Sequence, residues 1–274
     1  MPTKTVEFHF ITGLARAIFR NARLRGSWDA AGHYSDNWTE TPMVEETGDD
    51  GCPVFRARVP LDLAGQGRTF RWGVILAGPP GPNFWGIPTE VQDANSVERF
   101  REFRLQGGGA AVQVERYYFT FARRLGANKR FPGGGGAPGI WFAVWAPNAR
   151  SVDVVFADPA RGYIANDGTG IDAARPAVAL TRMADDIWEG GPAGDFDTFK
   201  SAPYMYRIVN AQGNTVYRTD IFSRGQIGRG NINPAQSAWP GTPATLDGTV
   251  GCSVVIDPDV VRRDFESTDR KSVV

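Results

Sequence analysis

The sequence predicts an all-β protein made of two tandem β-sandwiches followed by an extended C-terminal segment. Most apolar runs are short, alternate with polar residues and end at Gly, Pro, Asn or Asp, which is typical of short strands joined by turns. The 274 residues include 33 Gly, 19 Pro and eight Trp, a composition that favours turns and aromatic-rich strands. The two halves also repeat one order of strands and turns, which indicates two domains of one architecture.

The first half contains five predicted strands. They cover residues 6–12, 17–28, 54–61, 70–76 and 99–105. The last is irregular, because Phe100 and Phe103 are three positions apart and cannot share one face of an unbroken strand. A bulge would accommodate this spacing. The following residues, 112–125, fit either a strand or a short helix.

A second series of strands begins at GIWFAVWAPNARSVDVVF, residues 139–156. The preceding run PGGGG, residues 132–136, predicts a flexible turn or linker. Further strands are predicted at 177–183, 186–191, 204–209 and 214–222, and residues 250–258 fit one more strand or a docking segment. We therefore expect a first sandwich at 1–110, a connecting segment at 111–138, a second sandwich at 139–225 and an extended segment at 226–274.

Composition excludes several classes of function. The 30 basic and 30 acidic residues give no net charge, and the absence of a basic stripe argues against nucleic acid as a partner. No apolar run has the length of a signal peptide core or a membrane span, so a cytoplasmic protein with no membrane contact is expected. Cys52 and Cys252 form neither a disulfide framework nor a metal motif, and no cofactor is predicted.

The second half resembles the N-terminal β-sandwich of glycogen branching and debranching enzymes. The resemblance rests on FAVWAPNARSVDVVF, on MADDIWEGGPAG and on YMYRI, which occur in the family's order within residues 139–222. In the α-amylase superfamily this module precedes a catalytic (β/α)₈ barrel. The resemblance therefore implies an immunoglobulin-like sandwich, an α-glucan substrate and a barrel domain as a possible partner.

The first half resembles the starch-binding sandwich of the glucoamylase C-terminal type, over residues 5–106. The segments that carry this resemblance are LRGSWDAAGHYSDNW, VFRARVPLDLAGQGRTFRWGVI and FWGIPTE. It implies binding of an α-glucan polysaccharide, such as glycogen or starch, or of a maltooligosaccharide.

Trp38 and Trp85 are the main candidates for sugar contact. Both lie in segments rich in Gly, Pro and Asn, which predict loops, and the resemblance places them at the family's two stacking tryptophans. The alternative is that each ring caps the core of the sandwich. Two neighbours of Trp85, Asn83 and Glu90, offer hydrogen bonds to sugar hydroxyls. The family's hydrogen-bonding Lys falls on Gly73 in this sequence. Arg71, on the same strand face, is expected to compensate for it.

The remaining aromatic residues are assigned differently. Alternation places Trp28 and Trp72 in the first core, and the strand-type residues Trp141, Trp145 and Trp188 in the second. In the second sandwich the resemblance implies weaker sugar contacts at Tyr163, Arg207 and Tyr217. The alternative there is a purely structural module that packs against the barrel.

No catalytic residues are predicted. The superfamily's barrel requires two histidines, each within its own sequence motif. The only histidines here are His9, in FHF, and His33, in GHY, and neither lies in such a motif. The pairs Asp49–Asp50, Asp185–Asp186 and Asp195–Asp197 lie in Gly-rich segments and are interpreted as turn residues. We expect a non-catalytic α-1,4-glucan-binding accessory region of a glycoside hydrolase or glucan branching enzyme. The alternative is a structural or interaction pair of sandwiches without sugar affinity; a stand-alone enzyme is disfavoured.

Overall fold

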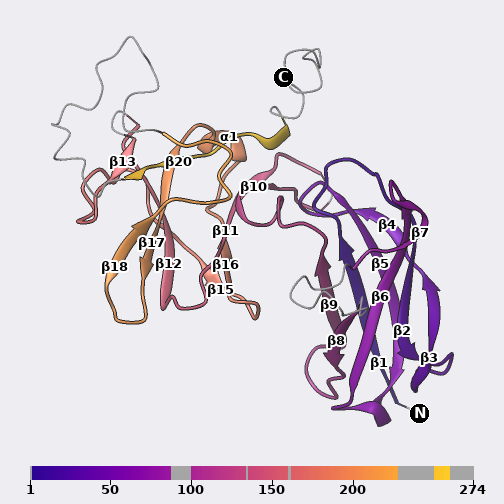
Figure 1. Ribbon diagram of the computed structural model, residues 1–274. Coiled ribbons are helices and arrows are strands. Elements are labelled where there is room, and N and C mark those ends of the chain that lie inside the picture. The colour runs from indigo at the N-terminus through magenta and orange to yellow at the C-terminus, as the bar shows by residue number, and fades with distance from the viewer. Residues whose placement is uncertain (1, 88–99, 134, 160–161, 228–249, 260–274) are drawn as a thin grey trace. The chain divides into compact units, whose positions relative to one another are not determined.

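A computed structural model describes residues 2–87, 100–133, 135–159, 162–227 and 250–259 of the chain (Figure 1). Strands make up 51% of the structure and helices 4%, which confirms the predicted all-β fold. The chain divides into two compact units, Met1–Phe121 and Ala122–Val274. No helix in the described ranges is long and apolar enough to cross a membrane.

The first sheet of the first unit has the strand order β4-β5-β1-β9. Its strands are β1 (Thr3–Ile11), β4 (Val44–Thr47), β5 (Pro53–Asp62) and β9 (Val112–Tyr118). The central strand β1 pairs antiparallel with β5 and parallel with β9. The ambiguous segment 112–125 therefore begins as a strand, and this strand belongs to the first unit.

The second sheet of this unit has the order β3-β2-β6-β7, with β8 also paired to β6. Its strands are β2 (Arg20–Trp28), β3 (Tyr34–Pro42), β6 (Thr69–Gly78), β7 (Gly81–Trp85) and β8 (Arg101–Arg104). β3 was not predicted, because this edge strand pairs with β2 alone in the described part of the sheet and has no fully buried residue. Apart from Tyr34, Trp38 and Pro42, its residues are polar, so no apolar alternation marks it.

Aromatic packing between the two sheets forms the core of the first unit. Phe8 of β1 stacks on Trp28 of β2, with ring centroids 5.3 Å apart, and contacts Trp72 of β6 at 5.1 Å. Both tryptophans are 1% exposed, which confirms their predicted place in the core. Burial of each such side chain contributes about 2–3 kcal/mol of transfer free energy.

The second unit is a sandwich of two sheets as well. One sheet has the order β10-β11-β16-β15 and the other β14-β12-β17-β18, with β20 also paired to β17. The strands of the first are β10 (Gly126–Arg130), β11 (Gly139–Trp145), β15 (Thr181–Arg182) and β16 (Ile187–Gly190); those of the second are β12 (Ser151–Phe156), β14 (Val178–Ala179), β17 (Pro203–Val209), β18 (Thr215–Arg218) and β20 (Ser253–Val254).

Three smaller features complete the second unit. The strands β13 (Tyr163–Ile164) and β19 (Val250–Gly251) pair with each other, and α1 (Phe196–Phe199) is a single helical turn.

The glycine run 132–136 joins β10 to β11, which pair as an antiparallel hairpin. It is therefore a turn inside the second unit, and the segment predicted to connect the sandwiches contributes one strand, β9 or β10, to each unit. The predicted domain boundaries themselves stay predictions.

The two tryptophans of β11 lie on the opposite face from the one predicted. Phe142 is fully buried and packs against Phe156 and Tyr204 in the core. Because neighbouring strand residues point to opposite faces, Trp141 and Trp145 face outward. Trp145 is 62% exposed, so its predicted core role is wrong. Trp141 is half-buried under the guanidinium of Arg130. The core role of Trp188 is confirmed by its 7% exposure.

This assignment of faces predicts unequal effects of mutation on one strand. Phe142→Ala should lower the free energy of unfolding by about 3–5 kcal/mol, because it empties a core position. Trp145→Ser should cost about 1 kcal/mol or less, since the ring is exposed. Equilibrium urea unfolding of the full chain measures both values, and a larger loss for Trp145→Ser than for Phe142→Ala would contradict the assignment.

Residues 250–259 return to the second unit and are fixed there by buried contacts. Cys252, Ser253 and Val255 are fully buried. The Ser253 hydroxyl accepts a hydrogen bond from the backbone N–H of Asp220 at 2.9 Å. The Asp220 carboxylate in turn accepts a hydrogen bond from the Tyr204 hydroxyl, with 2.6 Å between the two oxygens. Burial raises the pKa of this carboxyl. Residues 250–258 were predicted to be either a strand or a docking segment. They form the short strands β19 and β20 and also dock on the second unit through buried side chains.

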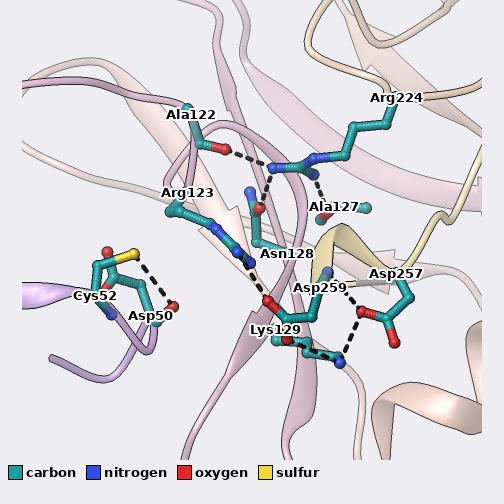
Figure 2. Close-up of polar contacts among 10 residues, drawn as sticks. All are labelled: Asp50, Cys52, Ala122, Arg123, Ala127, Asn128, Lys129, Arg224, Asp257 and Asp259. Atoms are coloured by element: carbon teal, nitrogen blue, oxygen red, sulfur yellow. Dashed lines mark hydrogen bonds and ion pairs between the residues drawn. The ribbon is translucent and has the colours of Figure 1, made fainter. Parts of the chain in front are cut away.

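Charged residues fix the end of this segment to β10 (Figure 2). The Lys129 ammonium lies 2.8 Å from a carboxylate oxygen of Asp257 and 3.1 Å from one of Asp259, and Arg123 lies 2.8 Å from Asp259. Burial alone would raise the pKa of both carboxyls, but hydrogen bonds from the cations, from Lys129 to Asp257 and from Arg123 and Lys129 to Asp259, lower both pKa values overall. We call these four residues the C-terminal clamp.

Beside the clamp, Arg224 holds the start of the second unit. Its guanidinium donates hydrogen bonds to the backbone oxygens of Ala122 and Ala127 and to the side-chain oxygen of Asn128, at 2.7, 3.1 and 2.9 Å (Figure 2). One side chain therefore ties the chain after β18 to the chain before and within β10.

The C-terminal clamp predicts a specific pH dependence of stability. The carboxyl pKa values are depressed below the ordinary 3.8, so their contribution is present above that pH and is lost as the pH falls through the folded-state values. The pKa of Lys129 is raised above 10.5: burial opposes this, and the hydrogen bonds to Asp257 and Asp259 outweigh it. Its contribution is therefore present below pH 10.5 and is lost as the pH rises through the folded-state value.

Lys129→Met should therefore cost about 1–3 kcal/mol at pH 7, and the loss should shrink at pH 3. Urea unfolding at the two pH values measures this difference. Hydrogen exchange of the amides in 250–257 should accelerate in the variant at pH 7. A deficit that is equal at both pH values would contradict the electrostatic role of the clamp.

Candidate functional site

The candidate site is the outer face of the sheet β3-β2-β6-β7 in the first unit. Trp38 lies in β3 and Trp85 ends β7, so both tryptophans are strand residues and the predicted loop setting is wrong. Both side chains are half-buried, unlike the core residues Trp28 and Trp72. The structure thus brings together the two residues that the sequence placed 47 positions apart.

Strand register explains why these residues share a face. Arg25 of β2 is directly opposite Glu40 of β3 and opposite Gly73 of β6, and Ile75 of β6 is opposite Trp85. Residues two apart on a strand point to the same side. Trp38, Arg25 and Trp85 therefore lie on one side of the sheet, while Trp72 and its alternate neighbours face the core.

Three aromatic rings meet on this face. The ring centroids of Trp38 and Trp85 are 6.3 Å apart with an interplanar angle of 87°, and Phe100 contacts Trp38 at 5.9 Å and 62°. Edge-to-face contacts of this kind are favourable and hold rings in fixed orientations. We call Trp38, Trp85 and Phe100 the aromatic cluster.

The sequence reasoning missed Phe100 as a site residue, although it contained the relevant signal. Phe103 faces the core and is 6% exposed. With a spacing of three, Phe100 then points to the outer side of the sheet, without the bulge that was expected. A second unpredicted member of this face is Arg25, whose guanidinium carbon lies 5.7 Å from the ring centroid of Trp85.

Two of the predicted polar residues, Arg71 and Asn83, lie on the same outer face as the aromatic cluster. Arg71 is exposed, and its guanidinium lies 4.8 Å from the Phe100 centroid and 3.0 Å from a carboxylate oxygen of Glu102. Asn83 is exposed and accepts a hydrogen bond from Arg23 at 2.6 Å. Glu90 lies outside the described residues. Their proposed contacts with sugar stay predictions.

The predicted candidates of the second unit have different surroundings. Tyr163 and Tyr217 are each 9% exposed, and Tyr217 packs in a small apolar cluster with Ile164 and Met205. The guanidinium of Arg207 lies 2.8 Å from a carboxylate oxygen of Asp153. This arrangement favours packing roles for the two tyrosines, since a sugar needs an open ring face.

Acidic pairs in the described residues serve local structure. The Asp50 carboxylate accepts the backbone N–H of Cys52 at 2.9 Å, as in an Asx turn. Asp185 pairs with Arg124 at 2.6 Å, and Asp186 pairs with Arg182 at 2.6 Å. Both of these pairs lie in turns or bends, as predicted. The turn assignment is wrong for the third pair, because Asp195 is the N-cap of α1 and Asp197 lies within this helix.

The first unit also contains a charged cluster on the outer face of its other sheet. Glu7 contacts His9 at 2.5 Å and Arg58 at 2.6 Å. The hydrogen bond from His9 is the main cause that lowers the pKa of Glu7, whereas burial lowers the pKa of His9. Because these groups satisfy one another across β1 and β5, we interpret them as structural.

Comparison with known proteins gives one stretch of sequence similarity. No protein-family model matches the chain. A stretch of 94 residues is 39% identical to the 1,4-alpha-glucan branching enzyme GlgB of Rhizobium meliloti (strain 1021), over 32% of this chain and 10% of that enzyme. The chain thus spans about a tenth of the length of this curated relative.

Solved structures with some likeness to this chain include two proteins with low sequence identity. Ligand-free PulA from Klebsiella pneumoniae has 14% identity and a TM-score of 0.29, over 89% of this chain and 20% of that one. The Group B Streptococcus pullulanase SAP has 9% identity and a TM-score of 0.31, over 94% and 27%. Likenesses at this level support no conclusion about this chain.

Proposed function

We propose that the first unit binds α-1,4-glucan, such as glycogen, starch or a maltooligosaccharide, on the face that carries the aromatic cluster. The observation that supports this proposal best is the meeting of Trp38, Trp85 and Phe100 on one outer sheet face, surrounded by arginine and amide side chains. A glucose unit has apolar C–H faces and a rim of hydroxyls. The half-buried aromatic rings can stack on the C–H faces, and the polar side chains can form hydrogen bonds with the hydroxyls.

The expected affinity is moderate. Burial of one sugar face on one ring contributes about 1–2 kcal/mol. Two rings with hydrogen bonds then give about −4 to −8 kcal/mol, which corresponds to roughly millimolar to micromolar dissociation constants. A polysaccharide with many equivalent chain ends gains further through multiple contacts.

The wider proposal is that the chain is a non-catalytic accessory region of an α-amylase-superfamily enzyme. The 94-residue similarity to a glucan branching enzyme supports it, as does the resemblance of residues 139–222 to the sandwich that precedes the catalytic barrel. In this proposal the first unit holds the polysaccharide while a (β/α)₈ domain acts on it, and the second unit packs as a structural module.

The second candidate function is a pair of interaction sandwiches without sugar affinity. It is favoured by exposed apolar side chains on the outer face of the sheet β10-β11-β16-β15, where Trp145 and Met183 are 62% and 42% exposed and flank Ile187. Exposed apolar residues of this kind are typical of contact surfaces. The two functions differ in whether the isolated chain binds glucan.

Affinity electrophoresis in glycogen or amylopectin gels tests the proposed binding. The wild-type chain should be retarded, and Trp38→Ala and Trp85→Ala should each weaken the retardation at least about tenfold in apparent affinity, since each removes a stacking ring. Trp145→Ala is the matched control, an exposed tryptophan of the second unit, and should migrate like the wild type. Unchanged mobility of the wild type in glucan would refute the binding proposal.

A further inference from the structure

Arg25 occupies the centre of the outer face, beside the aromatic cluster. It is opposite Glu40 on β3 and opposite Gly73 on β6. Gly73 has no side chain, so β6 places no group beside the guanidinium at this point of the sheet. The guanidinium carbon lies over Trp85, 5.7 Å from the ring centroid, which is within the range of a cation–π interaction.

The three arginines of this face differ in their partners. Arg23 donates to Asn83 at 2.6 Å and lies 3.5 Å from Glu40. Arg71 is held by Glu102 at 3.0 Å and stacks on Phe100. The buried Nε atoms of Arg23 and Arg25 both lack a hydrogen-bond acceptor. Arg25 differs from Arg23 and Arg71 in that, within the described part of the chain, it has no carboxylate partner either.

A half-buried guanidinium without acceptors costs free energy that a ligand can recover. Each donor left without a partner costs about 1–3 kcal/mol when buried. Guanidinium groups present parallel N–H donors in a planar fork that matches two neighbouring oxygen atoms. The guanidinium and the edge of Trp38 cover part of the Trp85 ring, but this side chain is only half-buried, so the remaining ring surface is accessible to a sugar.

We propose that Arg25 is the specificity-determining residue of this face and donates hydrogen bonds to the vicinal 2- and 3-hydroxyls of a glucose unit stacked at Trp85. This inference rests on the proposed function. In an α-1,4-linked chain those two hydroxyls are free and adjacent, whereas O1 and O4 form the linkages and O6 stands alone. A two-pronged donor therefore reads the diol edge of the chain, and the role expected of Arg71 belongs to Arg25.

Isothermal titration calorimetry of the full chain with β-cyclodextrin, a cyclic α-1,4-glucan, tests this. Arg25→Gln should weaken binding about tenfold. Arg25→Lys keeps the charge but not the planar pair of donors, so its affinity should lie between those of Arg25→Gln and the wild type. Arg20→Gln is the control: an exposed arginine at the start of the same strand, whose loss should leave affinity within twofold.

Methylated β-cyclodextrins separate a direct contact from a structural effect. Methyl groups on O2 and O3 leave the oxygen lone pairs in place but keep the guanidinium from reaching them, so this methylation should weaken wild-type binding about tenfold. It should weaken Arg25→Gln no further, because the contact is already absent there. Methylation at O6 should leave both unchanged. A mutation that merely disturbed the sheet would reduce affinity for all three sugars equally.

The possible failures are distinguishable. If the wild type binds and Trp38→Ala abolishes binding while Arg25→Gln binds within twofold of the wild type, the assignment of Arg25 is overturned and glucan binding stands. Equal sensitivity of wild type and Arg25→Gln to methylation at O2 and O3 would also overturn it. Absence of wild-type binding to β-cyclodextrin and to glycogen would overturn the proposed function and this assignment together.

Discussion

The packing of Trp72 against Phe8 is the interaction on which the candidate site depends. It fixes which side of β6 faces the core, and a one-residue shift of register would reverse both faces of the strand. With Trp72 inside, Arg71 and Gly73 must face out. Cross-strand pairing then places Arg25 beside Gly73. It places Trp85 beside Ile75, which is two residues further along β6. The outer aromatic cluster is therefore a consequence of the inner one.

The second unit is organised by contacts between segments far apart in the sequence. Arg224 holds residues about a hundred positions earlier, and the C-terminal clamp attaches Asp257 and Asp259 to β10. The result is a sandwich whose first and last described strands are fixed by buried charge pairs and by the Asp220–Tyr204 hydrogen bond. Such groups are costly to bury unless every partner is present, so these contacts favour one arrangement of the first and last described segments of this unit.

Prediction succeeded where a strand is buried on one face and failed where it is not. The core strand that carries Trp72 alternates clearly, and its assignment is confirmed. Trp188 is buried as predicted, although its neighbour Ile187 is buried too. The edge strand β3 does not alternate, because it has no buried side. For β11, both sets of alternate residues contain aromatics, so the pattern alone could not choose between Phe142 and the two tryptophans. Burial of Phe142 by Phe156 and Tyr204 decided it.

The sequence alone was enough to predict the all-β class and the core positions of Trp28, Trp72 and Trp188. Local periodicity and turn residues carry this information, because they act over a few positions. The choice of Trp38 and Trp85 as candidates for one site came from the resemblance to starch-binding sandwiches. Only the tertiary structure decided that Phe100 and Arg25 join that site and that Trp145 is exposed. These facts depend on which strands become neighbours and in which register, and long-range packing alone sets both.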